Sequence, residues 1–191
     1  AATFDGIRWF DVESGKVSAS LPCGKSGALL LSSDQRTLVA ATPRGVSRWK
    51  IDCADATPVI GSETAVHDAV HVGKLVGRDD LATIAWSGWG HPIHVITDHE
   101  RHFELPDSRG YDHVGMSPNG EWIAATRRFA DGVRIWNTGT ATLARTVPSV
   151  RDAGLAFHPD NTRFVVADNE SIREWEIQTG TNRWSIPRRQ P

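Results

Sequence analysis

The sequence has few cysteines, few lysines and no long apolar run. Its 191 residues include only Cys23 and Cys53, too few for the dense disulfide framework of a small secreted domain. The longest apolar runs, such as 28–31, are far below the roughly 20 residues needed to span a bilayer. We therefore expect free thiols, a reducing compartment such as the cytoplasm, and no membrane partner.

Signatures of catalysis and of nucleic-acid binding are missing as well. The chain has no Gly-x-Ser-x-Gly elbow, no phosphate-cradling glycine loop, no His-Glu-x-x-His and no Cys-x-x-Cys pair. A formal net charge of −2 gives no reason to expect a nucleic-acid partner. The basic residues are 17 Arg and 4 Lys, which suggests a GC-rich bacterial genome. The remaining composition, 39% hydrophobic and 23% charged, is that of one globular domain.

An internal repeat of about 40 residues is the main positive feature. Each copy has a short aliphatic stretch, a small-residue end, a turn and a strand that carries a large apolar residue. These large residues stand at steps of 39, 47, 40 and 39 residues, and are Phe10, Trp49, Ile96, Trp136 and Trp175. Thr3, Thr42 and Asp168 each precede the large residue by 7 positions. Two spacings that hold together indicate a true structural repeat.

Each copy is predicted to form four short antiparallel strands, a to d. In the last copy, turn chemistry at 158–161 precedes a β-branched strand at 164–166, and a strand at 172–177 precedes the turn 178–180. No window holds a 3.6-residue period of helical length. Because a lone four-stranded meander cannot cover its own apolar faces, the copies must pack on one another, as the blades of a β-propeller do. We therefore predict an all-β propeller fold.

On these residues the chain resembles the WD-repeat family, whose members are β-propellers. The likeness rests on the period near 40, on the tryptophan-bearing strand c, and on the turns Ser117-Pro118-Asn119-Gly120 and His158-Pro159-Asp160-Asn161. The Trp-Asp dipeptide of the family is replaced by Trp49-Lys50, Trp136-Asn137 and Trp175-Glu176, and its Gly-His pair is missing. The hydrogen-bonded tetrad of the family is therefore not carried over, and the chain is identified as a divergent member.

We expect a single propeller segment of four full blades plus about half of another. The predicted division is a partial blade at 1–22, blades at 23–61, 62–106, 107–148 and 149–187, and a tail at 188–191. The blade at 62–106 diverges most. Alignment gives the first blade no strand a, so the chain is interpreted as a C-terminal segment of a longer propeller whose remaining blades lie upstream. The alternative is a five-bladed ring closed irregularly by the half blade.

The divergent blade also holds the weak candidates for a metal site. His94, Asp98 and His102 have one parity along an extended strand and could share a face. A metal site needs three or four converging ligands, and a polar edge with solvated imidazoles is the alternative. We expect no metal and no cofactor. Cys23 and Cys53 are predicted near opposite ends of a strand, too far apart for a disulfide.

Two unusually long b–c connections, at 87–91 and 127–131, point to a binding face. Insertions in repeat proteins often lie on such a face, and arginine and aromatic residues are enriched at binding hot spots. The aromatic residues could instead cap blade cores and the arginines could be solvated. The predicted partner-binding face combines these loops with the d–a connections and comprises Lys25, Trp89, His91, Arg109, Tyr111, Arg127, Arg128, Phe129 and Arg151.

The leading functional hypothesis is a non-catalytic propeller that serves as a rigid scaffold for protein–protein interaction. A second hypothesis makes it the sensor or regulatory C-terminal domain of a larger protein that carries a kinase, NTPase or protease. A third is a divergent propeller hydrolase or metal enzyme. Three carboxylate or imidazole groups converging at the mouth of the channel would favour the enzyme.

Overall fold

A computed structural model describes residues 1–52, 58–68, 72–88, 90–97, 101–111, 113–129, 132–150 and 153–188. The chain divides into two compact units. The first comprises Ala1–Leu75 with Asp79–Leu81, and the second comprises Val76–Arg78 with Ala82–Pro191. The described residues form strands and turns without helices, so none of them forms a helix long and apolar enough to cross a membrane.

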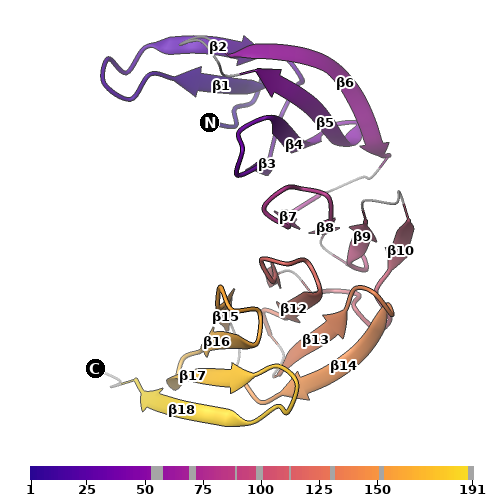
Figure 1. The fold of residues 1–191 in the computed structure, drawn as a ribbon, viewed down its shortest axis with the longest axis vertical. Coiled ribbons are helices and arrows are strands. Elements are labelled where there is room, and N and C mark those ends of the chain that lie inside the picture. Colours follow the sequence, from indigo (N-terminus) through magenta and orange to yellow (C-terminus); the bar gives the residue numbers. More distant parts are fainter. Residues whose placement is uncertain are drawn as a thin grey trace. The chain divides into compact units, whose positions relative to one another are not determined.

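The first unit holds a two-stranded and a four-stranded antiparallel sheet (Figure 1). The small sheet pairs β1 (Ile7–Phe10) with β2 (Val17–Leu21). The larger sheet contains, in order, β3 (Leu29–Leu31), β4 (Thr37–Thr42), β5 (Gly45–Asp52) and β6 (Val59–His67). The β5–β6 hairpin extends beyond the predicted blade boundary at residue 61, and its last pair joins Val46 to His67.

One apolar core joins the two sheets of the first unit. Trp49 and Leu38 from the four-stranded sheet pack with Ile7 of β1, and Trp9 and Leu21 lie against this cluster. Strands alternate their side chains between two faces, so the residues two positions apart in β5 reach the same core. Burial of these large side chains from water stabilises the sheet pair, at roughly 1.5–3 kcal/mol for each side chain.

The second unit holds three four-stranded sheets in a simple meander order. Strand β7 spans the boundary between the units. The sheets are β7 (Lys74–Gly77), β8 (Ile84–Ser87), β9 (His94–Ile96) and β10 (His102–Glu104); β11 (His113–Met116), β12 (Trp122–Thr126), β13 (Val133–Asn137) and β14 (Thr142–Val147); and β15 (Gly154–Phe157), β16 (Arg163–Ala167), β17 (Ser171–Glu176) and β18 (Asn182–Pro187).

The sheet β11–β14 is buried on both faces. Ile123 and Trp136 lie on one face and pack with Val95 of the preceding sheet. On the other face, Ile135 packs with Trp175 of the following sheet. This explains why strands b and c of this blade contain consecutive apolar residues, such as Ile123-Ala124-Ala125 and Ile135-Trp136, instead of alternating strictly with polar ones. In this unit, the Trp136 face therefore packs on the sheet before it, and the Trp175 face packs on the opposite side of the sheet β11–β14.

The a–b turns confirm the chemistry that the sequence indicated. The Ser117 hydroxyl accepts a hydrogen bond from the backbone NH of Trp122 at 2.9 Å and donates one to the Asn119 side chain at 2.8 Å. Gly120 closes the turn at φ 74°, where a side chain would be strained. Ser32 bonds to Asp34 and to the backbone of Thr37 in the same way.

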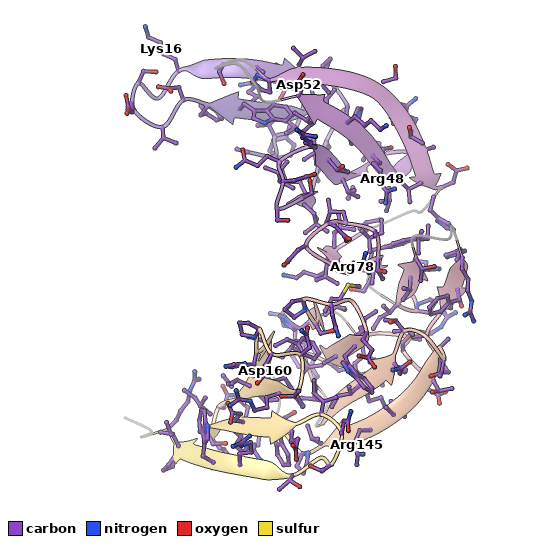
Figure 2. The ribbon with its side chains drawn as sticks, viewed as in Figure 1. Lys16, Arg48, Asp52, Arg78, Arg145 and Asp160 are labelled. Carbon is purple, nitrogen blue, oxygen red and sulfur yellow. The ribbon has the colours of Figure 1, made fainter. Side chains whose placement is uncertain are left out.

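Arg145 ties the last two sheets together beyond their apolar core. From β14 its guanidinium donates to the backbone oxygens of Ile177 at 3.1 Å and Thr179 at 3.0 Å, and also to that of Gln178. Figure 2 shows Arg145 beside the turn that joins β17 to β18. A Cβ added at Gly180 would stand 2.7 Å from Cδ of Arg145, so a larger residue there would force the arginine side chain to shift.

These observations confirm the all-β prediction. The described residues form four four-stranded antiparallel sheets and one two-stranded sheet, which matches the expected full blades and partial blade. Within each unit, consecutive sheets share apolar cores, as the argument from uncovered faces required.

Candidate functional site

The centre of the candidate site is Tyr111, in the connection from β10 to β11. Its side chain is only 5% exposed. The ring meets Trp136 edge to face, with centroids 5.6 Å apart and planes at 88°. The Trp136 indole donates a hydrogen bond to the backbone oxygen of Pro106 at 2.9 Å. Strand c therefore holds the ring of Tyr111 in a fixed orientation.

Two arginine side chains lie on the Tyr111 ring. The guanidinium carbon of Arg127 is 4.6 Å from the ring centroid, and that of Arg134 is 5.4 Å from it. Arg127 donates to the backbone oxygen of Arg109 at 2.5 Å, and Arg134 donates to that of Asp107 at 2.7 Å. The stacking is a favourable cation–π contact and leaves the edges of both guanidinium planes for other partners.

Two further arginines and an exposed ring lie near this stack in the sequence. Arg109 donates to the backbone oxygen of Gly90 at 3.3 Å. The Arg128 guanidinium lies 5.5 Å from the ring of Phe129, which is 77% exposed. We use the term arginine cluster for Arg109, Arg127, Arg128 and Arg134.

The charges of the arginine cluster are not balanced by ion pairs within the described residues. Each hydrogen bond that its guanidinium groups donate there ends on a backbone oxygen. Some arginines elsewhere do form ion pairs: Arg8 pairs with Asp5, and Arg163 pairs with Asp160, each at 2.6 Å, whereas Arg145 also donates to backbone oxygens. The Nε atom of Arg127 is buried and finds no hydrogen-bond partner in the part of the chain that the structure describes. Within the described residues, the cluster therefore groups four positive charges whose hydrogen-bond partners are neutral backbone oxygens.

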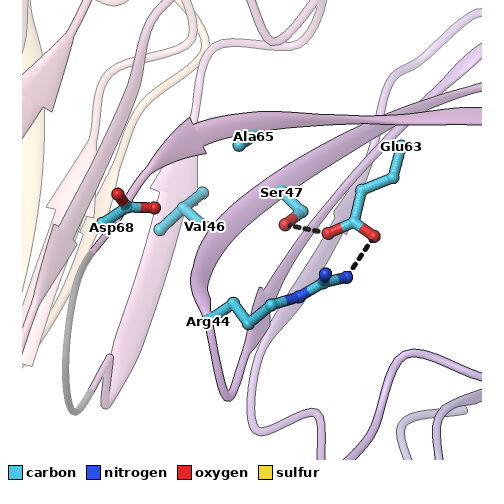
Figure 3. Close-up of a pocket in the computed structure, with 6 residues that line it drawn as sticks. All are labelled: Arg44, Val46, Ser47, Glu63, Ala65 and Asp68. Carbon is cyan, nitrogen blue, oxygen red and sulfur yellow. Dashed lines mark hydrogen bonds and ion pairs between the residues drawn. The ribbon is translucent and has the colours of Figure 1, made fainter.

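A pocket of about 380 Å³ lies at the b–c turn of the first unit (Figure 3). Arg44 and the Ser47 hydroxyl both donate to the Glu63 carboxylate, at 2.6 and 2.8 Å. Val46, Ala65 and Asp68 complete the lining. Because Glu63 already neutralises Arg44, the pocket offers few free charges to a ligand.

The nearby Cys23 is a free thiol, as predicted. Burial raises the pKa of the Cys23 thiol, and the Glu63 carboxylate raises it further. A thiol in this state is a weak nucleophile, which argues against a reactive cysteine in this pocket. Cys53 lies outside the described residues.

The metal candidates come together only in part. Nδ1 of His94 and Nε2 of His102 are 3.2 Å apart on neighbouring strands, and both rings stack with Trp86. The Glu104 carboxylate is 3.8 Å from His94. Asp98 lies outside the described residues. Among the residues that are described, no three His, Cys, Asp or Glu side chains form a group that could hold a metal ion.

A buried carboxylate stands where strand b of the last sheet ends. Asp168 accepts hydrogen bonds from the backbone NH groups of Val150 and Ser171 at 2.9 Å and pairs with Arg173. Burial raises its pKa, but these bonds outweigh that effect and hold the pKa below its ordinary value. In the preceding sheet, Thr126 bonds to the backbone of Ala153 from the equivalent position. These bonds anchor the β14–β15 connection without the Gly-His pair.

The other predicted face residues are placed as follows. Lys25, in the first unit, lies 5.5 Å from the exposed ring of Phe4. His91 is exposed, and its backbone oxygen accepts a hydrogen bond from Gly110. Trp89 and Arg151 lie outside the described residues. Sequence reasoning missed Arg134, although its position two residues before Trp136 puts both side chains on one face of strand c.

Together, the repeated sheets and their shared cores define a propeller-like protein. Among solved structures the chain is similar to the Kuenenia stuttgartiensis Hydrazine Synthase, with a TM-score of 0.66 and 15% sequence identity. The match covers 96% of this chain and 59% of that chain. At this identity the likeness shows the fold alone. No family model matches the chain, and no curated protein matches it.

Proposed function

We propose that this chain is part of a divergent WD-repeat-like propeller that acts as a non-catalytic scaffold and binds a protein partner through the arginine cluster. The observation that supports this function is the pair of guanidinium groups on the ring of buried Tyr111, together with the exposed ring of Phe129 in the same loop as Arg127. Arginine and aromatic side chains supply much of the binding energy at protein interfaces. Side chains that are already ordered lose little entropy on binding.

Proximity labelling in the source cell tests this function. The wild-type chain is compared with Phe129→Asp and Arg128→Glu, which change exposed residues of the loop. The matched control is Lys16→Glu, because Lys16 is exposed in the first unit and the charge change equals that of Arg128→Glu. We expect both loop variants to lose a common set of labelled proteins that the control retains. Identical labelling by all four folded chains would refute the proposal.

We also propose that further blades of the same protein cover the open face of the last sheet. Trp184 and Ile186 on β18 are 40% and 56% exposed. Their equivalents on β14 are Arg145, which contacts the next sheet, and the buried Val147. Hydroxyl-radical footprinting should therefore show Trp184 protected in the whole product of the gene and reactive in this chain alone. Equal reactivity in both would contradict the proposal.

A further inference from the structure

The chemical class of the partner follows from the hydrogen-bond partners of the arginine cluster. Its hydrogen bonds within the described residues end on backbone oxygens, and it has no carboxylate partner there. We infer that the cluster binds an acidic segment of a partner protein, whose carboxylates accept hydrogen bonds from the guanidinium groups and neutralise their charge. This inference rests on the proposed function and adds the class of ligand.

The stack on Tyr111 prepares the site for carboxylates. A guanidinium binds a carboxylate best through two parallel N–H donors, which requires its plane to be held in one orientation. The Tyr111 ring and the oxygens of Arg109 and Asp107 hold the planes of Arg127 and Arg134 in this way. Ordering long side chains before binding reduces the entropy lost in the complex.

Phe129 adds a requirement for an apolar group in the ligand. Its ring is 77% exposed, and Arg128 lies against it at 5.5 Å. Burial of such a ring against a leucine or aromatic side chain contributes hydrophobic energy, whereas a purely charged ligand leaves it in water. The segment that fits the cluster therefore carries a large apolar residue beside its acidic residues.

A protein segment fits these observations better than a nucleic acid does. The whole chain has a formal net charge of −2, and long polyanions require an extended positive track. Binding of single strands also uses aromatic rings on which bases stack. Tyr111 is buried beneath the two guanidinium groups and against Trp136, so Phe129 alone offers an exposed ring among the described residues of this loop, not the series of rings on which successive bases stack.

Fluorescence anisotropy with defined probes tests the inference. The probe is a labelled peptide, Gly-Ser-Glu-Asp-Leu-Glu-Asp-Gly-Ser, and its counterpart carries Gln and Asn in place of Glu and Asp. We expect the acidic peptide to bind at least about tenfold more tightly than the amide peptide, and to weaken as salt rises from about 50 to about 200 mM. A labelled oligothymidylate of equal charge serves as the nucleic-acid probe.

Three variants test whether binding depends on the ordered guanidinium groups or only on the positive charge of the chain. Arg127→Gln should weaken binding of the acidic peptide about tenfold, whereas Arg36→Gln, at an exposed turn of the first unit, should leave it unchanged. Tyr111→Leu keeps all four positive charges but removes the ring that positions two of them. It should therefore weaken binding by several fold, provided that circular dichroism shows a folded chain.

The outcomes distinguish this inference from the proposed function. Equal affinity for the acidic and amide peptides, or tighter binding of the oligothymidylate, would overturn the inference. Equal effects of Arg127→Gln and Arg36→Gln would also overturn it. If labelled proteins were still lost in Phe129→Asp, the scaffold function would stand with a partner of different chemistry. If they were not, both proposals would fail.

Discussion

The two units differ in how the arginines of their b–c connections are paired. Arg44 in the first unit and Arg127 in the second lie in the same connection of the repeat but have different partners. Arg44 forms an ion pair of 2.6 Å with Glu63, on the outer strand of its own sheet. Arg127 instead stacks on Tyr111 and bonds to a backbone oxygen in the preceding connection. The first arrangement neutralises the charge, and the second keeps it.

Two positions of the repeat account for this difference. The residue two places before the strand-c tryptophan is Ser47 in the first unit and Arg134 in the second. The residue opposite that tryptophan on the outer strand is Glu63 in one case and Leu143 in the other. In the first unit, Glu63 accepts hydrogen bonds from Ser47 and from Arg44 and neutralises the arginine. In the second unit, Arg134 adds a positive charge, and Leu143 offers no carboxylate. Substitutions at two positions of the repeat can therefore decide whether a loop arginine is neutralised within its own sheet.

The largest expected effect tests whether the two regions are energetically separate. Trp136→Ala removes a fully buried side chain and its hydrogen bond to Pro106, and we expect a loss of about 3–5 kcal/mol in unfolding free energy. Trp49→Ala is the counterpart in the first unit. Hydrogen exchange should show lost protection mainly in β11–β14 for the first variant and in β3–β6 for the second. Loss of protection throughout the chain in both would contradict separate units.

A smaller effect is expected when the Tyr111 ring is removed. Tyr111→Leu keeps an apolar side chain but abolishes both cation–π contacts and the edge contact with Trp136. We expect a cost of about 1–3 kcal/mol, measured by urea denaturation. Arg44→Met breaks only an exposed ion pair and should cost less than about 1 kcal/mol. A greater loss of unfolding free energy for Arg44→Met than for Tyr111→Leu would contradict this order.

The smallest effect concerns the chemistry of Cys23. Because the Glu63 carboxylate raises the pKa of this thiol, Glu63→Gln should lower it, so that alkylation proceeds faster at a given pH. Arg44→Met should have the opposite effect, since Arg44 lowers the same pKa. The measurement is the rate of alkylation against pH, with Cys53 replaced by Ser so that a single thiol reports. Unchanged pH profiles in both variants would show that the pair does not act on the thiol.

Much of the fold could be predicted from the sequence, because turns and packing are encoded locally. Ser117 and Gly120 specify their turn by side-chain bonding and by positive φ, and the spacing of the tryptophans sets the repeat. The Glu63 pairing could not be predicted, since it depends on register shifts in the β5–β6 hairpin. Asp168 stands at the position of Thr42 in the repeat, which the spacing predicts. Its hydrogen bond from Val150 could not be predicted, because it joins residues 18 apart in the chain.

The bond set of Arg145 has a consequence for how such chains diversify. Its guanidinium sits in one sheet and its carbonyl partners in the next, where a Cβ at position 180 would stand 2.7 Å from the arginine side chain. A tandem copy of either sheet alone would keep this junction but add a second one that lacks either the arginine or the glycine. Arg145 and Gly180 are thus a matched pair, and a change at one is expected to be accompanied by a change at the other.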